Sequence, residues 1–152
     1  MRIISKTPEE TENIAVKILR RLTALPPQKT ATVLSLKGDL GSGKTTFSQF
    51  LAKRLGVKGA IQSPTFLLIK RYPTFNHIFQ NFFHIDAYRI EKESEFSNLG
   101  FSEMISNPEN IIAIEWPEKI SGLIPSDAYE ISFEHGENQN ERIINVPDEI
   151  FE

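Results

Sequence analysis

Cysteine is absent from the chain of 152 residues. Disulfide bonds, thiol nucleophiles and zinc sites made of cysteine are therefore excluded. Long apolar runs are absent as well: no stretch is long enough to span a bilayer, and the N-terminus lacks the apolar core of a signal peptide. From these absences we expect a cytoplasmic protein with no membrane segment.

Positive charge is also in short supply. The formal net charge is −3 at pH 7, with 17 Lys and Arg against 20 Asp and Glu. Such a balance gives no bulk positive field that would hold a nucleic acid unaided. Hydrophobic residues at 39% and charged residues at 24% are ordinary for a globular protein. Because this length suits one core, we expect residues 1–152 to form a single domain.

The most informative feature that the chain does contain is a glycine-rich loop followed by Lys-Thr. It reads Gly38-Asp39-Leu40-Gly41-Ser42-Gly43-Lys44-Thr45. In this pattern the glycines let the backbone turn successive N–H groups toward a polyphosphate. The lysine brings a positive charge to the β- and γ-phosphates, and the threonine hydroxyl binds Mg²⁺. The loop therefore predicts a site for a nucleoside triphosphate with Mg²⁺.

The residues on either side of this loop support that interpretation. Residues 31–36 form a short, partly β-branched apolar run that is typical of a buried strand. After the loop, Phe47, Phe50, Leu51 and Leu55 recur at helical spacing, and Gly56 is a suitable residue to end the helix. Strand, loop and helix thus follow in the order that places a helix N-terminus at the phosphates.

The remaining chain indicates how the fold is completed. The patterns predict a helix from Thr7 to about Pro26, strands at 66–72 and 77–84, short helices within 92–106, a buried strand at 110–115, and a hairpin of 129–133 with 142–146. The phenylalanines between residues 75 and 83 are expected in the core. Together these elements predict an α/β, P-loop NTPase-like mixed sheet flanked by helices, with a C-terminal antiparallel hairpin. Its ligand is expected at the carboxyl edge of the parallel strands.

Two acidic residues are placed to act beside the loop. Asp86 follows Phe82-Phe83-His84-Ile85, and Glu115 follows the apolar strand 111–114. Enzymes with a phosphate loop use an acid at the end of a strand to hold Mg²⁺ or to orient the attacking water. Either acid alone is as readily a solvated surface group. The residues do not decide which of the two is the direct metal ligand.

Several further polar residues have two readings. Ser63 and Thr65 flank Pro64 after the loop helix, where they form either a γ-phosphate sensor or an ordinary proline turn. His84 is either a switch or base, or a packed and hydrogen-bonded side chain. Trp116, the only tryptophan, either shields the site or belongs to the core or an interface.

Four motifs in this order resemble one family. They are Gly38-Asp39-Leu40-Gly41-Ser42-Gly43-Lys44-Thr45-Thr46-Phe47, Ser63-Pro64-Thr65-Phe66, His84-x-Asp86-x-Tyr88-Arg89 and Glu115-Trp116-Pro117-Glu118. The set resembles TsaE (YjeE), a family of small bacterial ATPases in the biosynthesis of threonylcarbamoyladenosine in tRNA. The resemblance covers nearly the whole chain. Ser42 departs from it, since the family usually has alanine there, and we expect little effect from this small change.

The resemblance implies a function and a set of site residues. The family hydrolyses ATP weakly alone and works with the TsaD–TsaB pair, which transfers threonylcarbamoyl to adenosine 37 of tRNA. It is expected to meet tRNA only through that complex. The implied catalytic acids are Asp86 and Glu115, which with Thr45 are also the implied metal ligands. The implied nucleotide-binding residues are Thr11, Gly38, Asp39, Leu40, Gly41, Ser42, Gly43, Lys44, Thr45, Thr46, Ser63 and Thr65.

Other classes of P-loop protein fit the sequence less well. A small-molecule kinase needs an arginine-bearing lid, and no arginine cluster lies between residues 90 and 141. A GTPase needs an Asn-Lys-x-Asp guanine reader, which the chain lacks. A regulatory ATP-binding subunit with negligible turnover stays open as an alternative, against which Asp86 and Glu115 are the main argument.

Overall fold

The computed structural model describes residues 1–62 and 68–152. Its elements in chain order are β1 (Arg2–Ser5), α1 (Pro8–Ala24), β2 (Thr32–Gly38), α2 (Lys44–Arg54), β3 (Ile69–Pro73), β4 (Asn81–Asp86), α3 (Glu93–Ser97), α4 (Phe101–Ser106), β5 (Asn110–Glu115), β6 (Tyr129–His135) and β7 (Arg142–Asn145). Two short 3-10 helices lie at Pro117–Leu123, between β5 and β6, and at Asp148–Ile150, after β7. Within the described ranges, every helix is too short or too polar to cross a bilayer.

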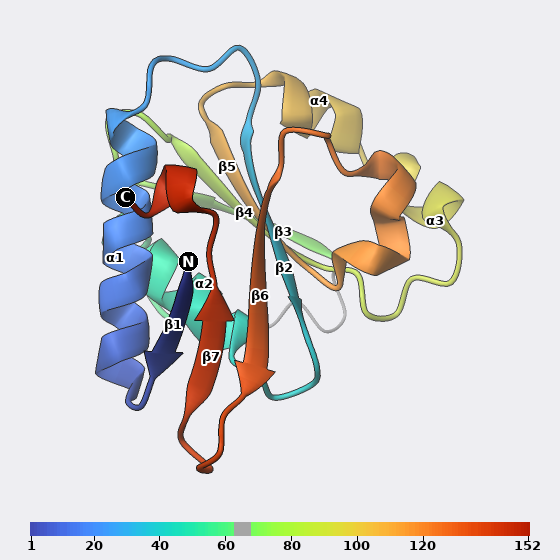
Figure 1. The fold of residues 1–152 in the computed structure, drawn as a ribbon. Coiled ribbons are helices and arrows are strands. Elements are labelled where there is room, and N and C mark those ends of the chain that lie inside the picture. The colour runs from blue at the N-terminus through green and yellow to red at the C-terminus, as the bar shows by residue number, and fades with distance from the viewer. Residues whose placement is uncertain (63–67) are drawn as a thin grey trace.

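All seven strands form one mixed sheet in the order β1-β7-β6-β2-β5-β4-β3 (Figure 1). The four central strands, β6, β2, β5 and β4, run parallel to one another, and β7 and β3 pair antiparallel at the two sides. The carboxyl ends of the four parallel strands therefore share one edge of the sheet. The predicted α/β class with a C-terminal antiparallel hairpin is confirmed.

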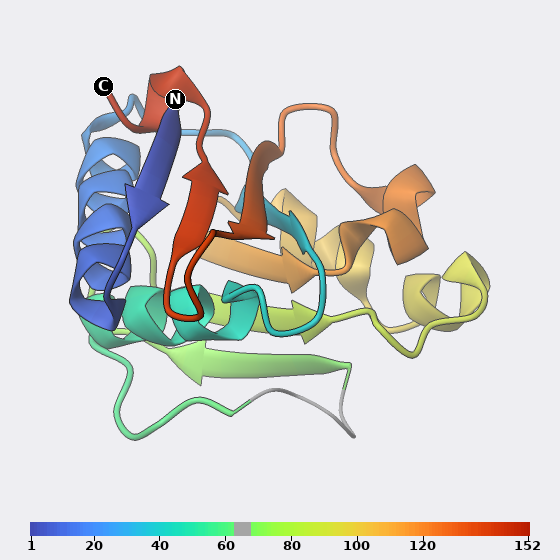
Figure 2. The ribbon, with the colours of Figure 1, turned by 60° about the horizontal axis from the view of Figure 1, so that its bottom comes forward.

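Helices cover both faces of this sheet (Figures 1 and 2). On one face α1 and α2 pack over a core that includes Ile18, Phe47 and Phe133. On the other, α3, α4 and the first 3-10 helix enclose a second core around Phe96 and Ile114. Because β5 lies between two parallel neighbours and under both layers, all six of its residues are buried, as its unbroken apolar run predicts.

The predicted start of α1 at Thr7 is confirmed. The Thr7 side chain accepts a hydrogen bond from the Glu10 backbone N–H at 3.2 Å, as in a capping box. The Glu10 carboxylate, however, accepts from the backbone N–H of Lys6 at 2.6 Å. The helix ends at Ala24, just before the prolines at 26 and 27.

The second of the two predicted strands after α2 has the wrong bounds. It begins at Asn81 instead of residue 77, because residues 74–80 form a turn in which the Asn76 side chain accepts from the backbone N–H groups of Ile78 and Phe79. The turn also carries Phe75 outward. Its side chain is 73% exposed, so its expected place in the core is wrong, whereas Phe79 and Phe82 are buried.

Strand β1 was not predicted. It has only four residues and no clear alternation of apolar and polar side chains, and it pairs with β7 across almost the whole length of the chain, Arg2 opposite Asn145. Strand β7 therefore lies inside the sheet between β1 and β6. This pairing positions the start of α1 beside the hairpin, which matters for the cavity described next.

Candidate functional site

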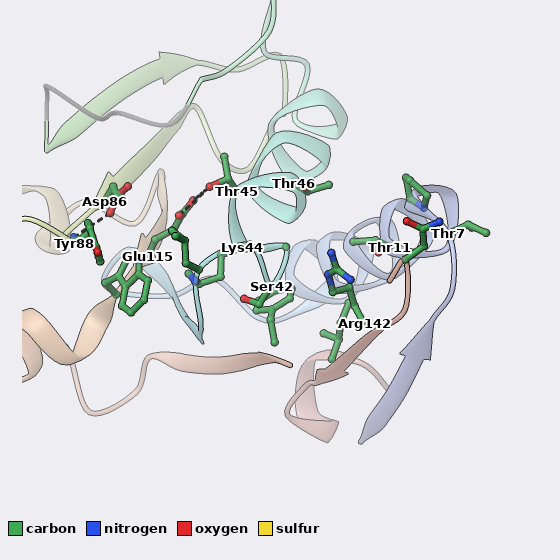
Figure 3. A pocket seen from close by; sticks show the side chains of 18 of the residues that line it. Thr7, Thr11, Ser42, Lys44, Thr45, Thr46, Asp86, Tyr88, Glu115 and Arg142 are labelled. Atoms are coloured by element: carbon green, nitrogen blue, oxygen red, sulfur yellow. Dashed lines mark hydrogen bonds between the residues drawn. The ribbon is translucent and has the colours of Figure 1, made fainter. Parts of the chain in front are cut away.

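A cavity of about 480 Å³ opens at the carboxyl ends of the parallel strands (Figure 3). Loops that follow β2, β4 and β5 form one part of it, and the start of α1 and the β6–β7 hairpin form the other. Its lining comprises Thr7, Pro8, Thr11, Leu40, Gly41, Ser42, Gly43, Lys44, Thr45, Thr46, Leu68, Asp86, Tyr88, Arg89, Glu115, Trp116, Phe133, Asn140, Arg142 and Ile144.

The glycine-rich loop has the geometry of an anion-binding loop. Its last glycine, Gly43, has a φ of 110° and stands directly before α2. The first helical hydrogen bond that follows the loop runs from the Phe47 N–H to the Gly43 carbonyl at 2.9 Å. The backbone N–H groups of the preceding first turn thus have no carbonyl of an earlier turn to bind. These donors, together with the helix dipole, suit a negatively charged group in the cavity.

Gly38 fixes how closely the loop approaches β6. Its φ is 147°, and a Cβ atom there would lie 2.4 Å from the Phe133 carbonyl oxygen and 2.7 Å from Ser42 Oγ. No side chain fits in that space. The loop can therefore begin only with glycine, in agreement with the sequence pattern.

Lys44 holds a buried positive charge at the floor of the cavity. The side chain donates to the Gly38 carbonyl and, at 2.8 Å, to the Asp39 carbonyl, and the residue is only 5% exposed. Its Nζ also lies 4.4 Å from the centre of the Trp116 ring. Burial lowers the pKa of Lys44, and the nearby carboxylates, Glu115 foremost, act in the opposite direction. Because its hydrogen bonds to described residues go to neutral carbonyls, this ammonium group fits an anionic ligand.

Glu115 is bound from two sides. Thr45 Oγ1 donates to both carboxylate oxygens, at 2.9 and 3.0 Å, and His84 Nε2 lies 2.7 Å from Oε1 (Figure 3 shows the Thr45 contact). Because a carboxylate only accepts, His84 Nε2 is the donor. Glu115 is 3% exposed and His84 fully buried. Of the two readings of His84, the packed and hydrogen-bonded side chain is the one observed.

Asp86 lies opposite Glu115, since these residues are direct neighbours in the pairing of β4 with β5. Its carboxylate is half-buried and accepts from the Tyr88 N–H at 3.0 Å. Among the described residues, no group of three or more His, Cys, Asp or Glu gathers as a metal cage. A cation at this edge would therefore have Thr45 and the two acids as candidate protein ligands and would take its other oxygens from ligand and water.

Trp116 and Tyr88 form the wall beside these acids. Trp116 has a φ of 58°, the one positive value outside glycine in residues 1–62 and 68–152, and its ring lies 4.9 Å from that of Tyr88. This left-handed conformation lets the chain turn at the end of β5, and the Lys44 ammonium lies over the Trp116 ring. Both interpretations of Trp116 hold, because it lines the cavity and also packs against the core around Ile114.

The far part of the cavity lies between α1 and the hairpin. Thr11 Oγ1 is 2.7 Å from Ser5 Oγ, which ties the start of α1 to β1. Across from it, the Arg142 guanidinium donates to the carbonyls of Gln139 and Glu141, at 2.8 and 2.9 Å. Arg142 could not be predicted as a site residue. The alternating pattern of its strand does not indicate that its first residue lies beside the glycine-rich loop, about a hundred residues earlier in the chain.

Most of the expected site residues meet in this one cavity. Those in its lining are Thr11, Leu40, Gly41, Ser42, Gly43, Lys44, Thr45, Thr46, Asp86 and Glu115. Gly38 and Asp39 stand behind it and contribute carbonyl groups to Lys44. Ser63 and Thr65 lie outside the described residues. The residues that sequence reasoning left out come mainly from the two ends of the chain: Thr7, Pro8, Phe133, Asn140, Arg142 and Ile144.

Comparison with known proteins gives one consistent family. A family model described as "Threonylcarbamoyl adenosine biosynthesis protein TsaE" matches residues 5–144. The tRNA threonylcarbamoyladenosine biosynthesis protein TsaE of Bacillus subtilis is 40% identical over 82% of this chain and 71% of its own length. The proteins of the same name from Borreliella burgdorferi and Aquifex aeolicus are each 38% identical. These alignments cover 66% and 77% of this chain, and 71% and 77% of the respective relatives.

A solved structure matches the fold. The crystal structure of YdiB from Bacillus subtilis superposes with a TM-score of 0.72 at 28% sequence identity. The match covers 97% of this chain and 86% of YdiB. The overall fold is therefore shared over almost the whole chain.

Proposed function

The chain belongs to the TsaE family, and on this premise we propose that it is a Mg²⁺-dependent ATPase of tRNA threonylcarbamoyladenosine biosynthesis. In this role it supports the transfer of threonylcarbamoyl to adenosine 37 of tRNA. Its partners are the TsaD and TsaB proteins, and its place is the cytoplasm. The relatives' names supply the pathway, and the cavity supplies the argument for ATP turnover.

One observation carries this proposal: Thr45 and Glu115 are already hydrogen-bonded to each other in the cavity that contains Lys44. A hydroxyl beside a buried carboxylate at the start of the loop helix fits a Mg²⁺ ion bound to phosphates. The orphan N–H groups at the start of α2 and the Lys44 ammonium fit the phosphates themselves. The chain also lacks the guanine reader of GTPases, which favours ATP.

The chemistry is divided between ligand and protein. Bound ATP with Mg²⁺ supplies the phosphoanhydride bond and the cation that offsets its charge. Lys44 and the first turn of α2 bind and orient the phosphates, and Lys44 leaves its carbonyl partners to do so. Thr45 and Glu115 would hold the cation, His84 keeps the Glu115 carboxylate in position, and Asp86 on the adjacent strand would orient water. Trp116 and Tyr88 exclude bulk water from this edge.

The test is ATP hydrolysis by the purified chain with and without the purified TsaD–TsaB pair. We expect weak hydrolysis alone and a clear increase with the pair, both dependent on Mg²⁺. Lys44→Ala should abolish tight binding of ATP, whereas Lys119→Ala, an exposed lysine outside the cavity, should bind as the unchanged chain does. Tight ATP binding without turnover in any mixture would contradict the proposal and leave the regulatory subunit as the better reading.

A further inference from the structure

The net charge of −3 conceals a marked separation of charge along the chain. Between Leu40 and Ile85 there is no Asp or Glu, but there are four lysines and two arginines. All 20 acidic residues lie elsewhere in the sequence. The acid-free segment comprises the phosphate-loop helix, β3, most of β4 and their connections, so the excess positive charge belongs to one part of the fold.

That part is the β3 side of the sheet, where it lies next to the end of α2 (Figure 2). The Phe75 backbone N–H donates to the Leu55 carbonyl at 2.9 Å, and a Cβ on Gly56 would lie 2.9 Å from Phe75 Cβ. The turn after β3 is thus fastened to the end of α2. The end of α2, with its exposed cations, therefore lies beside the turn that follows β3.

The cations on this surface differ in how far they are neutralised. Lys53 and Arg54 share the Glu12 carboxylate of α1, at 3.0 and 2.9 Å. Lys58 and Lys70 are exposed and form no salt bridge with any described residue. Arg71 donates to the neutral side-chain amide of Asn81, at 2.6 and 3.0 Å. We call Lys58, Lys70, Arg71 and Phe75 the basic edge.

Phe75 gives this edge a second kind of contact. Its ring is 73% exposed, and the Lys58 ammonium lies 5.0 Å from the ring centre. Burial in the core does not explain this phenylalanine. An exposed ring beside the Lys58 ammonium, with Lys70 over the Tyr72 ring on the neighbouring strand, matches the surfaces that bind single-stranded nucleic acid, where a base stacks on the ring and the cations meet phosphates.

We propose that the basic edge binds the phosphodiester backbone of RNA directly, with an unpaired base on Phe75, in place of the expected contact with tRNA only through the TsaD–TsaB complex. Charge complementarity with phosphates carries the inference, and it rests on the proposed role in tRNA modification. An acidic protein surface would satisfy the cations but leave the exposed ring without a partner. On the adjoining α1, the Glu12 carboxylate is already paired with Lys53 and Arg54.

The test measures binding of an unmodified tRNA transcript to the full chain at several salt concentrations. The triple variant Lys58→Ala, Lys70→Ala, Arg71→Ala should lose most of the affinity at low salt. Because each phosphate contact adds about 0.7 to 0.9 to the slope of log K against log salt, the slope should fall by about 2 to 3. Phe75→Ala should weaken binding about five-fold or more without changing the slope, and Phe75→Tyr should retain it.

A matched triple controls for loss of charge. Arg2, Lys29 and Lys119 are exposed and lie outside the acid-free segment, so their change to Ala removes the same charge and should leave affinity and slope nearly unchanged. Equal losses in both triples, or no salt-dependent binding by the unchanged chain, would overturn the proposal. The proposal would also be overturned if the basic-edge triple variant no longer bound the TsaD–TsaB pair but still bound RNA, since the edge would then bind an acidic protein.

Hydrolysis of ATP separates this inference from the proposed function. None of the basic-edge residues lines the cavity. The triple variant should therefore hydrolyse ATP with the TsaD–TsaB pair, without tRNA, at the rate of the unchanged chain. If the proposed function is wrong, no variant will hydrolyse ATP. If only this inference is wrong, ATP hydrolysis will be normal, and the triple variant will bind RNA as well as the unchanged chain does.

Discussion

The His84 Nε2 atom lies 2.7 Å from Glu115 Oε1, and both side chains are almost fully buried. The pair joins adjacent strands, because His84 lies two residues before Asp86 on β4, and Glu115 ends β5. His84 thus fixes one oxygen of the carboxylate, while Thr45 spans both. The carboxylate is held before any ligand arrives, which is how a buried site avoids reorganisation during reaction.

His84 should accordingly act as a positioning residue. His84→Leu removes the donor to Glu115, and we expect ATP turnover to fall about 10-fold to 100-fold, as for other partners of metal-binding side chains. His84→Gln keeps an N–H donor and should recover part of the loss. Steady-state kinetics and thermal unfolding check this together. A loss of stability with unchanged kcat in His84→Leu would show that the histidine serves only the fold.

The two acids should affect turnover more than binding. Glu115→Ala and Asp86→Ala should each lower kcat by about 10²–10³-fold, since orientation of water and offset of charge matter most in the transition state. ATP affinity, measured by titration, should change much less. Glu130→Ala is a matched control, because this acid pairs on the surface with Lys37. Full activity of both site variants would place the reacting centre elsewhere.

Two glycines with positive φ allow a test of the loop. Gly38→Ala places a Cβ 2.4 Å from the Phe133 carbonyl, whereas Gly59→Ala, at a φ of 82°, meets nothing within 4 Å. Gly59→Ala should cost about 1 kcal/mol of unfolding free energy from backbone strain alone. Gly38→Ala should cost clearly more and disturb the loop. Denaturant unfolding of both variants measures the difference, and equal costs would mean that the loop yields easily.

Site residues could be predicted from the sequence where an acid stands at the carboxyl end of an apolar strand. Asp86 and Glu115 were found because parallel strands end at one edge, and the structure pairs them directly. Contacts between distant segments were not predictable. Strand β1 becomes recognisable only through its pairing with β7. Arg142, at the start of β7, reaches the cavity only because β7 lies near the glycine-rich loop. Phe75 was misplaced because strand spacing continues through a turn that Asn76 stabilises.

The buried ammonium of Lys44 should lower the stability of the nucleotide-free protein. Burial lowers its pKa in the folded state relative to the unfolded chain, so the buried charge destabilises the fold at neutral pH, and this cost lessens as pH rises toward the unfolded value. Lys44→Met should abolish tight ATP binding and leave the nucleotide-free protein at least as stable at pH 7. Thermal unfolding with and without ATP, at pH 7 and 9.5, is the measurement. A clearly less stable variant would mean that the carbonyl contacts outweigh burial.

Trp116 should report ligand binding directly. It is the only tryptophan, and the Lys44 ammonium lies 4.4 Å from its ring centre. If Lys44 turns from the Gly38 and Asp39 carbonyls to bound phosphates, the charge beside the ring moves, and the emission changes. We therefore expect ATP with Mg²⁺ to shift the tryptophan fluorescence of the unchanged chain, with a midpoint equal to the dissociation constant from direct titration.

Two variants show whether the signal arises from that movement. Lys44→Met has no ammonium to move, so even at ATP concentrations high enough to fill its weakened site it should show no change in fluorescence. Trp116→Phe should lose the signal but bind ATP within a few-fold of the unchanged chain, because an aromatic ring still covers the site beside Tyr88. A full fluorescence response in Lys44→Met would contradict the proposed exchange of partners, since the ring would then be sensing the nucleotide and not the lysine.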